Sequence, residues 1–405
     1  MKAWATDKLG WLCLKVSSGG TPLRSVLEYY ENGTIPWMKT GEVKKSVIYD
    51  TEEKITEAGL ENSSAKLVPA NSVIVAMYGD GDTPGNVAIN KVPLTTNQAC
   101  CNFTLDPDKA HYRFIYFYLK GSYNNLVNLK LGGSQQNLNA QSLKSFPITH
   151  PEIEVQRKIA AILSAYDDLI ENNQRRIALL EKMAEEIYRE WFVRLRFPGY
   201  EKVTFVKGVP QGWEIKKLGS VLELCYGKAL KDDDRVPGEF LVYGSGGVVG
   251  THHEALVKTS GLIVGRKGNV GSVYWPDRGF FPIDTVYFVK SELPNSFLYF
   301  LLRSMNFINN DSAVPGLNRN QAYSNLFFLP PIPLIKKYAE VADSQFEMKR
   351  FLTRQNENLR AMRDSLLPRL ISGKLSVENL DIQFPPSMAE NALTPTLSQR
   401  ARETV

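Results

Sequence analysis

Hydrophobic residues recur at helical spacing through two long stretches of the chain, residues 152–192 and 335–372. Their steps of three and four residues follow a heptad pattern. Each stretch therefore predicts a helix about 60 Å long, and we place the two helices at 151–197 and 334–375. The predicted pairing positions are Ile162, Leu169, Ile177, Leu180 and Ile187 in the first helix, and Val341, Met348, Leu352, Leu359 and Leu366 in the second.

An apolar stripe of this length must be covered by another apolar surface. The other long helix covers it most simply, in an antiparallel coiled coil. Three polar residues in the stripe, Asn173, Gln345 and Asn356, fit the selection of one register. In the alternative arrangement the helices do not pair, and each packs on its own globular part.

The rest of the chain has a different pattern, with short apolar runs broken by Gly, Pro and Asn. Such runs predict strands, with helices expected near 110–129 and 294–309. The predicted strands include 72–77, 86–89, 261–264, 271–275 and 285–289. The fold class is therefore α+β, with one globular module at 1–150 and a linker plus a second module at 198–333. Residues 376–405 lack periodicity, which predicts a disordered tail.

The chain also contains an internal repeat. Trp4-x-x-x-Lys-Leu-Gly10 recurs as Trp213-x-x-x-Lys-Leu-Gly219, 209 residues later. Leu138-Asn139 recurs as Leu317-Asn318, and the helix pattern of Leu180 recurs from Leu359, both 179 residues later. These ordered matches indicate a tandem duplication with a pseudo-twofold axis, and chance similarity of two amphipathic helices is the weaker explanation.

Composition restricts the class of protein. The 405 residues are 43% hydrophobic and 22% charged, with a net charge of +5. This excludes a mostly disordered or membrane-spanning chain, and it permits nucleic-acid binding without requiring it. The four cysteines form no Cys-x-x-Cys pair. Free thiols and the absence of a secretion signal favour a cytoplasmic location.

Polar loops in both modules contain residues suited to reading DNA. Asn and Gln can pair with adenine, Arg and Lys can pair with guanine, and glycines allow close approach of the backbone. Each loop by itself is weak evidence, because such clusters are usually turns. The candidate DNA-binding residues are Lys39, Thr40, Gln135, Gln136, Asn137 and Asn139 in the first module, and Tyr243, Ser245, Arg266, Lys267, Asn318, Arg319 and Asn320 in the second.

Enzyme signatures are missing from the sequence. There is no phosphate-binding loop, no dinucleotide fingerprint, no adenine-methyltransferase tetrapeptide and no metal-ligand spacing. We therefore expect no catalytic residues and no metal site, and a role in binding and assembly. The alternatives are a coiled-coil scaffold that does not bind DNA and a stand-alone nuclease or methyltransferase.

Two variable modules alternating with two similar helices resemble the specificity subunit of type I restriction-modification systems. The resemblance covers residue 4 to about 375. The motifs that carry it are Lys8-Leu-Gly10 with Ser18-Gly-Gly-Thr-Pro22, Ile35-Pro-Trp37, Thr96-Asn-Gln98, Asp167-Asp168-Leu-Ile-Glu171 with Trp191-Phe192, and Arg363-Asp-Ser-Leu-Leu-Pro368 with Leu370-Ile-Ser-Gly373. The second module departs from it, since Gly-Gly-Thr-Pro is absent near Tyr226-Gly227.

The resemblance implies a function. Each module would be a target recognition domain that reads one half of a bipartite site in double-stranded DNA. The helices would fix the spacing of the half-sites and dock two modification (methyltransferase) subunits, and two restriction (ATP-dependent nuclease) subunits would complete the assembly. S-adenosylmethionine, ATP and magnesium would be bound by those partners and not by this chain.

Overall fold

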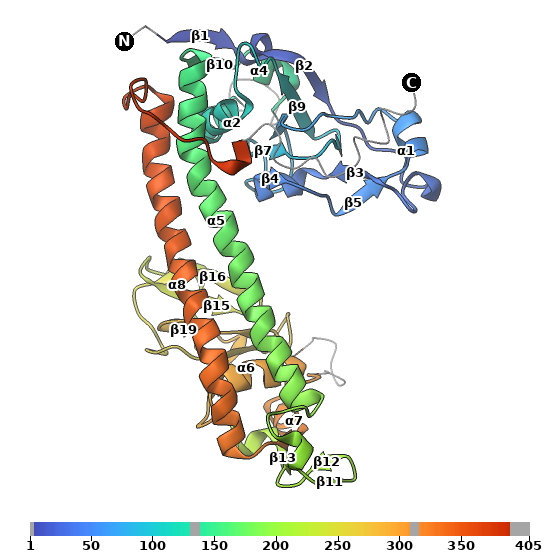
Figure 1. Cartoon of the computed structure of the whole chain (residues 1–405), viewed down its shortest axis with the longest axis vertical. Helices are drawn as coiled ribbons and strands as arrows, with labels where there is room; N and C mark the ends of the chain where they lie inside the picture. The colour runs from blue at the N-terminus through green and yellow to red at the C-terminus, as the bar shows by residue number, and fades with distance from the viewer. Residues whose placement is uncertain (1–3, 130–137, 308–315, 389–405) are drawn as a thin grey trace. The chain divides into compact units, whose positions relative to one another are not determined.

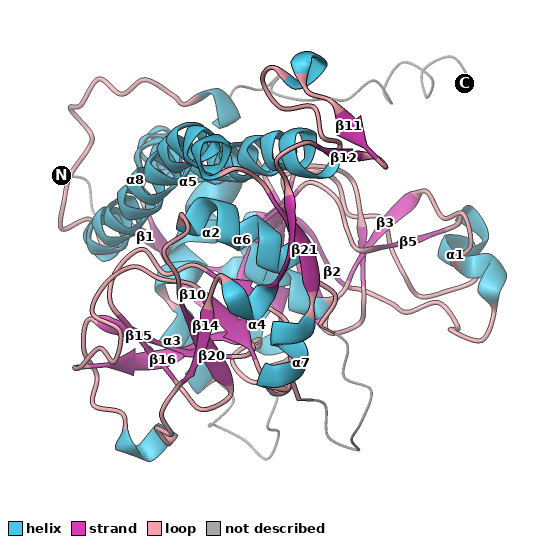
Figure 2. Cartoon of the chain, turned by 90° about the horizontal axis from the view of Figure 1, so that it is seen from below, coloured by secondary structure: helices cyan, strands magenta, loops and turns pink. Residues whose placement is uncertain are grey.

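The computed structural model describes residues 4–129, 138–307 and 316–388, and the chain divides into two units. Unit 1 comprises Met1–Glu171 and Asn356–Val405, and unit 2 comprises Asn172–Gln355. Both units mix sheets with helices, so the predicted α+β class is confirmed (Figures 1 and 2). No helix among the described residues is long and apolar enough to cross a membrane.

Unit 1 is built on a five-stranded sheet of order β2-β9-β6-β7-β4. All four residues of β6 are buried, which explains its uninterrupted apolar sequence. A second sheet has the order β5-β3-β8, and β1 pairs with β10 in a ribbon. The strands are β1 (Ala5–Lys8), β2 (Cys13–Ser18), β3 (Ile35–Met38), β4 (Val47–Ile48), β5 (Glu53–Ile55), β6 (Val73–Ala76), β7 (Val87–Asn90), β8 (Thr95–Thr96), β9 (Cys100–Leu105) and β10 (Pro147–His150).

The main core of unit 1 lies between this sheet and its helices. Helix α2 contributes buried aromatic residues such as Phe114 and Phe117, and the start of α5 contributes Ile159 and Leu163. The end of α8 adds Leu370 to the same cluster. The helices of the unit are α1 (Glu57–Glu61), α2 (Tyr112–Gly121), α3 (Tyr123–Asn128) and α4 (Ala140–Lys144), together with parts of α5 (Ile153–Tyr188) and α8 (Ile332–Ile371).

Unit 2 has a four-stranded sheet of order β14-β20-β17-β18 and a three-stranded sheet of order β16-β15-β19. Two ribbons, β11-β12 and β13-β21, complete it, with helices α6 (Asn295–Ser304) and α7 (Arg319–Ser324). The strands are β11 (Phe205–Val206), β12 (Val209–Pro210), β13 (Glu214–Lys217), β14 (Glu223–Tyr226), β15 (Phe240–Gly244), β16 (Gly247–His252), β17 (Ile263–Gly265), β18 (Val273–Tyr274), β19 (Phe280–Pro282), β20 (Val286–Lys290) and β21 (Leu326–Leu329).

The predicted strands and helices of the modules are therefore confirmed as elements, with ends shifted by a few residues. The long helices are also confirmed: α5 has 36 residues and α8 has 40. Helix α5 continues into a π-helical turn at Arg189–Val193. The two helices run antiparallel and side by side (Figures 1 and 2).

The buried face of each helix differs from the predicted heptad stripe. Leu169 is 52% exposed, Val341 is 38% exposed and Met348 is 42% exposed, so their assignment to the pairing seam is wrong. Nearby residues are buried instead, among them Ile170 and Phe346. Leu352 is also buried, whereas Ile162, Ile177, Leu180, Ile187, Leu359 and Leu366 are half-buried.

The reason for this difference is that the helices pack on the modules as well as on each other. In unit 2 one apolar cluster joins Tyr188 of α5, Tyr338 of α8 and Phe297 of α6. Phe346 of α8 packs against Trp275 with ring centroids 4.5 Å apart. Pairing and packing on a module, which the sequence presented as alternatives, therefore occur together within this unit.

The segment after α8 also differs from its prediction. Residues 376–388 were expected to belong to a disordered tail, but Val377 is 1% exposed and belongs to the core of unit 1. Arg113 donates a hydrogen bond to the carbonyl oxygen of Ser387 at 3.1 Å, and Lys158 donates one to that of Glu378 at 2.7 Å. The rest of the predicted tail, 389–405, lies outside the described residues.

The duplication is visible in the backbone. Ribbon β1-β10 of unit 1 corresponds to ribbon β13-β21 of unit 2, and each lies beside a Lys-Leu-Gly segment. After β2, a Cβ added at Gly19 would lie 2.2 Å from a carbonyl oxygen, and after β14 one added at Gly227 would lie 2.1 Å from another. Only glycine allows so close an approach. The two modules therefore share a frame even where their loop sequences differ.

Candidate nucleic-acid interface

In unit 2 the fold brings together two of the predicted loops. Arg266 and Lys267 follow β17, and the backbone N–H of Leu317 donates to the carbonyl oxygen of Arg266 at 2.7 Å. This bond places Asn318 and Arg319, at the start of α7, beside the β17 loop. Asn318 and Asn320 are exposed, and Lys267 lies 4.0 Å from a carboxylate oxygen of Asp284. Five predicted residues therefore belong to one surface.

The centre of this surface is Tyr226, the last residue of β14, whose side chain is 49% exposed. The guanidinium carbon of Arg266 lies 5.0 Å from the centroid of its ring, and that of Arg319 lies 5.2 Å from it. Both are within cation–π distance. None of the ion pairs among the described residues involves either arginine. Two positive charges therefore flank one half-exposed aromatic ring without a carboxylate to neutralise them.

Two further tyrosines, buried Tyr287 and half-buried Tyr323, support this arrangement. Tyr287 lies 5.0 Å from Tyr226 between ring centroids, and its hydroxyl donates to the carbonyl oxygen of Leu317 at 3.0 Å. Burial raises the pKa of Tyr287 to about 12, so the ring is neutral at physiological pH. Tyr323 of α7 accepts a hydrogen bond from the backbone N–H of Leu224 at 2.9 Å. These bonds fix the ends of β14 and α7 that carry Tyr226 and Arg319.

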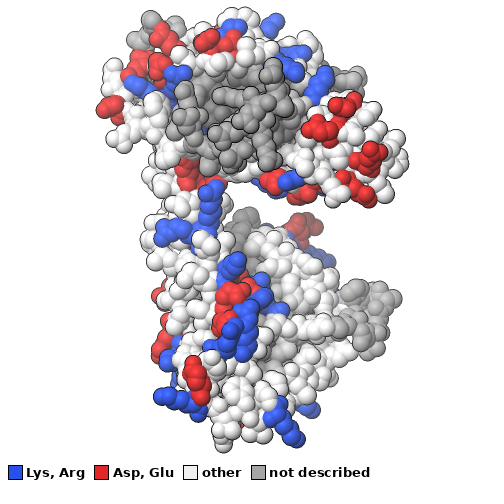
Figure 3. All heavy atoms as spheres, turned by 45° about the vertical axis from the view of Figure 1, so that its right-hand side comes forward, with Lys and Arg blue, Asp and Glu red and all other residues white. Residues whose placement is uncertain are grey.

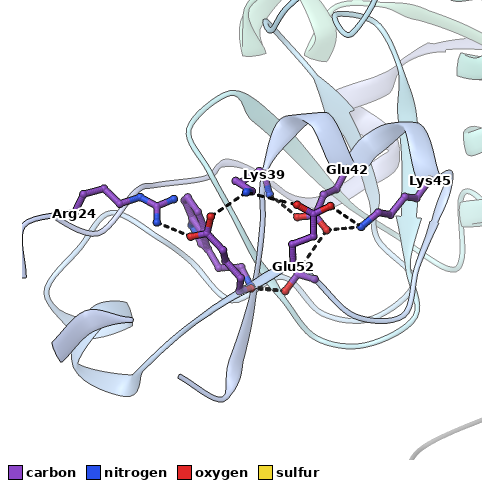
Figure 4. A network of polar contacts seen from close by, with 8 residues as sticks. Arg24, Lys39, Glu42, Lys45 and Glu52 are labelled. Carbon is purple, nitrogen blue, oxygen red and sulfur yellow. Dashed lines mark hydrogen bonds and ion pairs between the residues drawn. The ribbon is translucent and has the colours of Figure 1, made fainter. Parts of the chain in front are cut away.

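In unit 1, the basic residues Arg24 and Lys39 are paired with carboxylates (Figure 4). The Lys39 ammonium lies 2.9 Å from Glu53 and 3.6 Å from Glu52. Arg24 pairs with Glu53 at 2.5 Å while its guanidinium carbon lies 4.7 Å from the ring of Trp37. The hydrogen bond from Arg24 and then that from Lys39 hold the pKa of Glu53 below its usual range, so the carboxylate stays charged. The predicted DNA contact Lys39 is thus already neutralised.

Glu42 organises the neighbouring backbone. Its side chain is 3% exposed and accepts hydrogen bonds from the backbone N–H groups of Lys39 at 3.1 Å and Glu52 at 3.2 Å. The Lys45 ammonium lies 2.9 Å from the same carboxylate. Glu42 therefore ties the short helix that follows Lys39 to the turn before β5, as Figure 4 shows.

Two of the predicted DNA-binding residues are buried in the structure. Thr40 is 7% exposed, and its hydroxyl donates to Asn97 at 2.9 Å. Tyr243 is 9% exposed and packs with Phe280 in an apolar cluster. Ser245 is half-buried, and its carbonyl oxygen accepts a hydrogen bond from Tyr274 at 2.9 Å. Both residues therefore contribute to the packing of the fold, Thr40 through a hydrogen bond and Tyr243 through its ring.

Two predicted asparagines begin equivalent helices. The side-chain oxygen of Asn139 accepts from the N–H of Ser142 at 2.8 Å at the start of α4, and that of Asn318 accepts from the N–H of Asn320 at 2.8 Å at the start of α7. Each is an N-cap, so its oxygen is already used. The remaining predicted residues of this loop, Gln135, Gln136 and Asn137, lie outside the described residues.

Sequence reasoning missed Tyr226, Tyr323 and Arg24. In the sequence, Tyr226 marks only the place where the Gly-Gly-Thr-Pro motif is absent. Its position is nevertheless equivalent to that of Ser18, because Tyr226 precedes Gly227 as Ser18 precedes Gly19. Alignment of the two copies at these glycines would have shown an aromatic residue replacing a serine at the edge of a loop.

On the face of the molecule drawn in Figure 3, Lys and Arg side chains lie in small groups among Asp and Glu. No single basic patch dominates this face. Among the described residues there is no group of His, Cys, Asp and Glu that could hold a metal ion. A cavity of about 430 Å³ in unit 1 is lined by Trp4, His150 and Glu378 among others, and by none of the predicted DNA-binding residues.

The chain is similar in sequence to proteins of one family. The family model described as the type I restriction modification DNA specificity domain matches residues 1–182. The chain is 27% identical to the type I restriction enzyme MjaIX specificity subunit of Methanocaldococcus jannaschii, over 90% of this chain and 92% of that protein. It is 32% identical to the EcoR124I/EcoR124II specificity subunit of Escherichia coli, over 46% of this chain and 47% of that protein.

The fold is also similar to a solved structure. The crystal structure of the S subunit of a type I restriction-modification system from M. genitalium superposes with a TM-score of 0.55. The match covers 91% of this chain and 96% of that chain, at 18% sequence identity. This likeness concerns the fold, including the two long helices alternating with sheet-containing modules.

Proposed function

Because the chain belongs to the specificity subunits of type I restriction-modification systems, a non-catalytic family, we propose that it selects a bipartite DNA site, with one half-site read by each module. The observation that carries this proposal is the duplicated frame. Ribbon, glycine turn and capped helix recur in both units, whereas the side chains on the frame differ. Two modules with the same backbone and different surface side chains are suited to binding two half-sites of different sequence.

The chemistry belongs to partner subunits in this proposal. Two modification subunits bind S-adenosylmethionine and methylate the adenine of each half-site, and two restriction subunits use ATP and magnesium. An adenine in duplex DNA must leave the stack before it can be methylated, and the pocket that receives it belongs to the methyltransferase. The complex acts in the cytoplasm, where the DNA is.

The long helices are the proposed docking surface for the modification subunits. In unit 2, helix α5 exposes Leu179 by 60% and Met183 by 51%, one helical turn apart on the same face. Helix α8 exposes Phe351 by 56%. Apolar side chains exposed in a row are typical of a protein interface.

A direct test is to produce the chain with its modification subunit and sequence the methylated positions in host DNA. We expect a discontinuous motif with two short halves and a spacer of fixed length, bound by the purified complex in a gel-shift assay. A continuous motif, or no DNA binding, would contradict the proposal. Partner binding that is insensitive to salt and accompanied by no DNA affinity would favour the scaffold alternative.

The docking surface is tested by Leu179→Asp. A charge on an apolar contact should weaken co-purification of the modification subunit at least tenfold and leave the recognised bases unchanged. Gln174→Asp is the matched control, because it introduces the same charge at another exposed position of α5. Equal loss in both variants, or a changed motif, would count against docking at this face.

A further inference from the structure

The two arginines beside Tyr226 are held in different ways. One N–H of Arg266 donates to the carbonyl oxygen of Asp284 at 3.0 Å, so part of that guanidinium is already used. The Arg319 guanidinium takes part in none of the hydrogen bonds or ion pairs of the described residues. It lies 5.2 Å from the ring centroid of Tyr226 and 6.0 Å from that of Tyr323. Aromatic rings therefore position Arg319 while its N–H donors stay unpaired.

A free guanidinium held by rings is arranged for a ligand with two adjacent acceptors. Its N–H groups form a planar fork, and rings beside it reduce the freedom lost on binding. Arg266 and Arg319 each lie about 5 Å from the centroid of the Tyr226 ring, at 5.0 and 5.2 Å, so an electron-rich group beside this ring meets positive charge from both. Guanine offers two acceptors, O6 and N7, at the spacing of the fork in the major groove.

The same position in unit 1 has different chemistry. Asn318 corresponds to the helix cap Asn139, so Arg319 corresponds to Ala140. Tyr323, which lies over Gly219, corresponds to Lys144, which lies over Gly10. Ser18 stands before Gly19 where Tyr226 stands before Gly227. The backbone is shared, and three positions at one corner, one exposed and two half-buried, carry different side chains. This is the pattern expected where the two modules read different bases.

We propose that Arg319, positioned by Tyr226 and Tyr323, reads a guanine in the half-site recognised by the module of unit 2. Tyr226 is a positioning residue in this reading, because it acts through the guanidinium. The inference rests on the proposed function and goes beyond it, since it names one base and the side chain that selects it. The guanine can lie on either strand of the half-site.

The experiment measures binding of the complex with its modification subunit to a panel of DNA duplexes, in which each base pair of the half-sites is changed in turn. Arg319→Ala should reduce discrimination at one G·C pair by about tenfold to a hundredfold. Arg319→Lys should keep general affinity and still lose discrimination, because an ammonium lacks the fork. Discrimination throughout the other half-site should be unchanged.

Tyr226 provides the readout for positioning. Tyr226→Leu removes the ring and should weaken the preference for the same G·C pair severalfold, whereas Tyr226→Phe keeps the ring and should leave it unchanged. Arg278→Ala is the matched control, because Arg278 is an exposed arginine of the same unit with no hydrogen bond or ion pair among the described residues. It should change affinity slightly and equally for all duplexes.

The possible outcomes distinguish failure of this inference from failure of the proposed function. If Arg319→Ala weakens binding equally for every duplex, the arginine contacts phosphate and the guanine assignment is wrong. If the variants change nothing while the wild-type motif is bipartite, the inference fails and the proposed function stands. If the wild-type complex has no bipartite motif, the proposed function itself fails.

Discussion

The two modules share a backbone frame and use basic side chains in opposite ways. In unit 1, Arg24 and Lys39 are paired with the carboxylate of Glu53. In unit 2, Arg266 and Arg319 surround Tyr226 and have no carboxylate partner among the described residues. Charge in the first module therefore stabilises the loop, and charge in the second is available to a ligand.

This difference shows why counting basic residues does not locate a DNA-binding surface. Lys39 and Arg319 are both basic residues of segments that the sequence predicts to be polar loops, and both were candidates for the same reason. A paired ammonium must lose its carboxylate before it can neutralise a phosphate, whereas a guanidinium held by rings loses nothing. The partners of a charge, which come from other strands, decide its role.

The largest expected effect is loss of the structural network in unit 1. Glu42→Ala leaves two backbone N–H groups without their acceptor and leaves Lys45 with Glu52 alone, which should destabilise this unit by about 3 kcal/mol. Scanning calorimetry should show the unfolding of unit 1 moving to lower temperature. Glu61→Ala is the control, since Glu61 is an exposed residue at the end of α1, and it should change stability little.

A smaller effect is expected from a substitution that makes the basic residues of the first module resemble those of the second, with fewer carboxylate partners. Glu53→Gln removes the carboxylate shared by Arg24 and Lys39, so Arg24 becomes available to phosphates and Lys39 keeps only its longer contact with Glu52. Non-specific DNA affinity should rise, and the slope of log affinity against log salt should steepen by about one to two. Glu61→Gln changes the net charge equally without releasing a paired cation, and a similar steepening there would refute the explanation.

The two units should also differ in how their stability depends on pH. Burial, followed by the charge of Arg113, lowers the pKa of His111 in unit 1 to about 4, so the folded state resists protonation. Stability from neutral His111 should be complete above its ordinary pKa of 6.5 and be lost as pH falls toward 4. Burial acts to raise the pKa of Glu181 in unit 2, but Lys349, Tyr299 and Arg303 together outweigh it and the pKa is lowered from 4.5.

Unit 1 should therefore begin to lose stability at a higher pH than unit 2. Unfolding measured between pH 7 and pH 3 should show this order. His111→Gln should reduce the dependence of unfolding free energy on pH in the upper part of this range. Glu181→Gln should reduce it only below about pH 5. If His111→Gln leaves the pH dependence of stability unchanged, this histidine is not the cause of the loss of stability in unit 1.

Much of the fold could be predicted because its signals are local. The heptad pattern identified α5 and α8, and the short apolar runs identified β6, β7, β17 and β20. The pairing seam was only partly predictable. A heptad assumes one partner on one side, but Phe346 packs on Trp275 of the module, so the buried face turns away from Met348.

The sequence by itself determined the duplication, the two long helices and the family, because repeats and periodicity lie in the order of residues. Tertiary structure alone decided which candidates can meet a ligand. It buried Thr40 and Tyr243, paired Lys39 with Glu53, and placed Tyr226 between two arginines that are 40 and 93 residues away along the chain. Charge, burial and ring contacts depend on neighbours in space, and the strand order of the sheets supplies those neighbours.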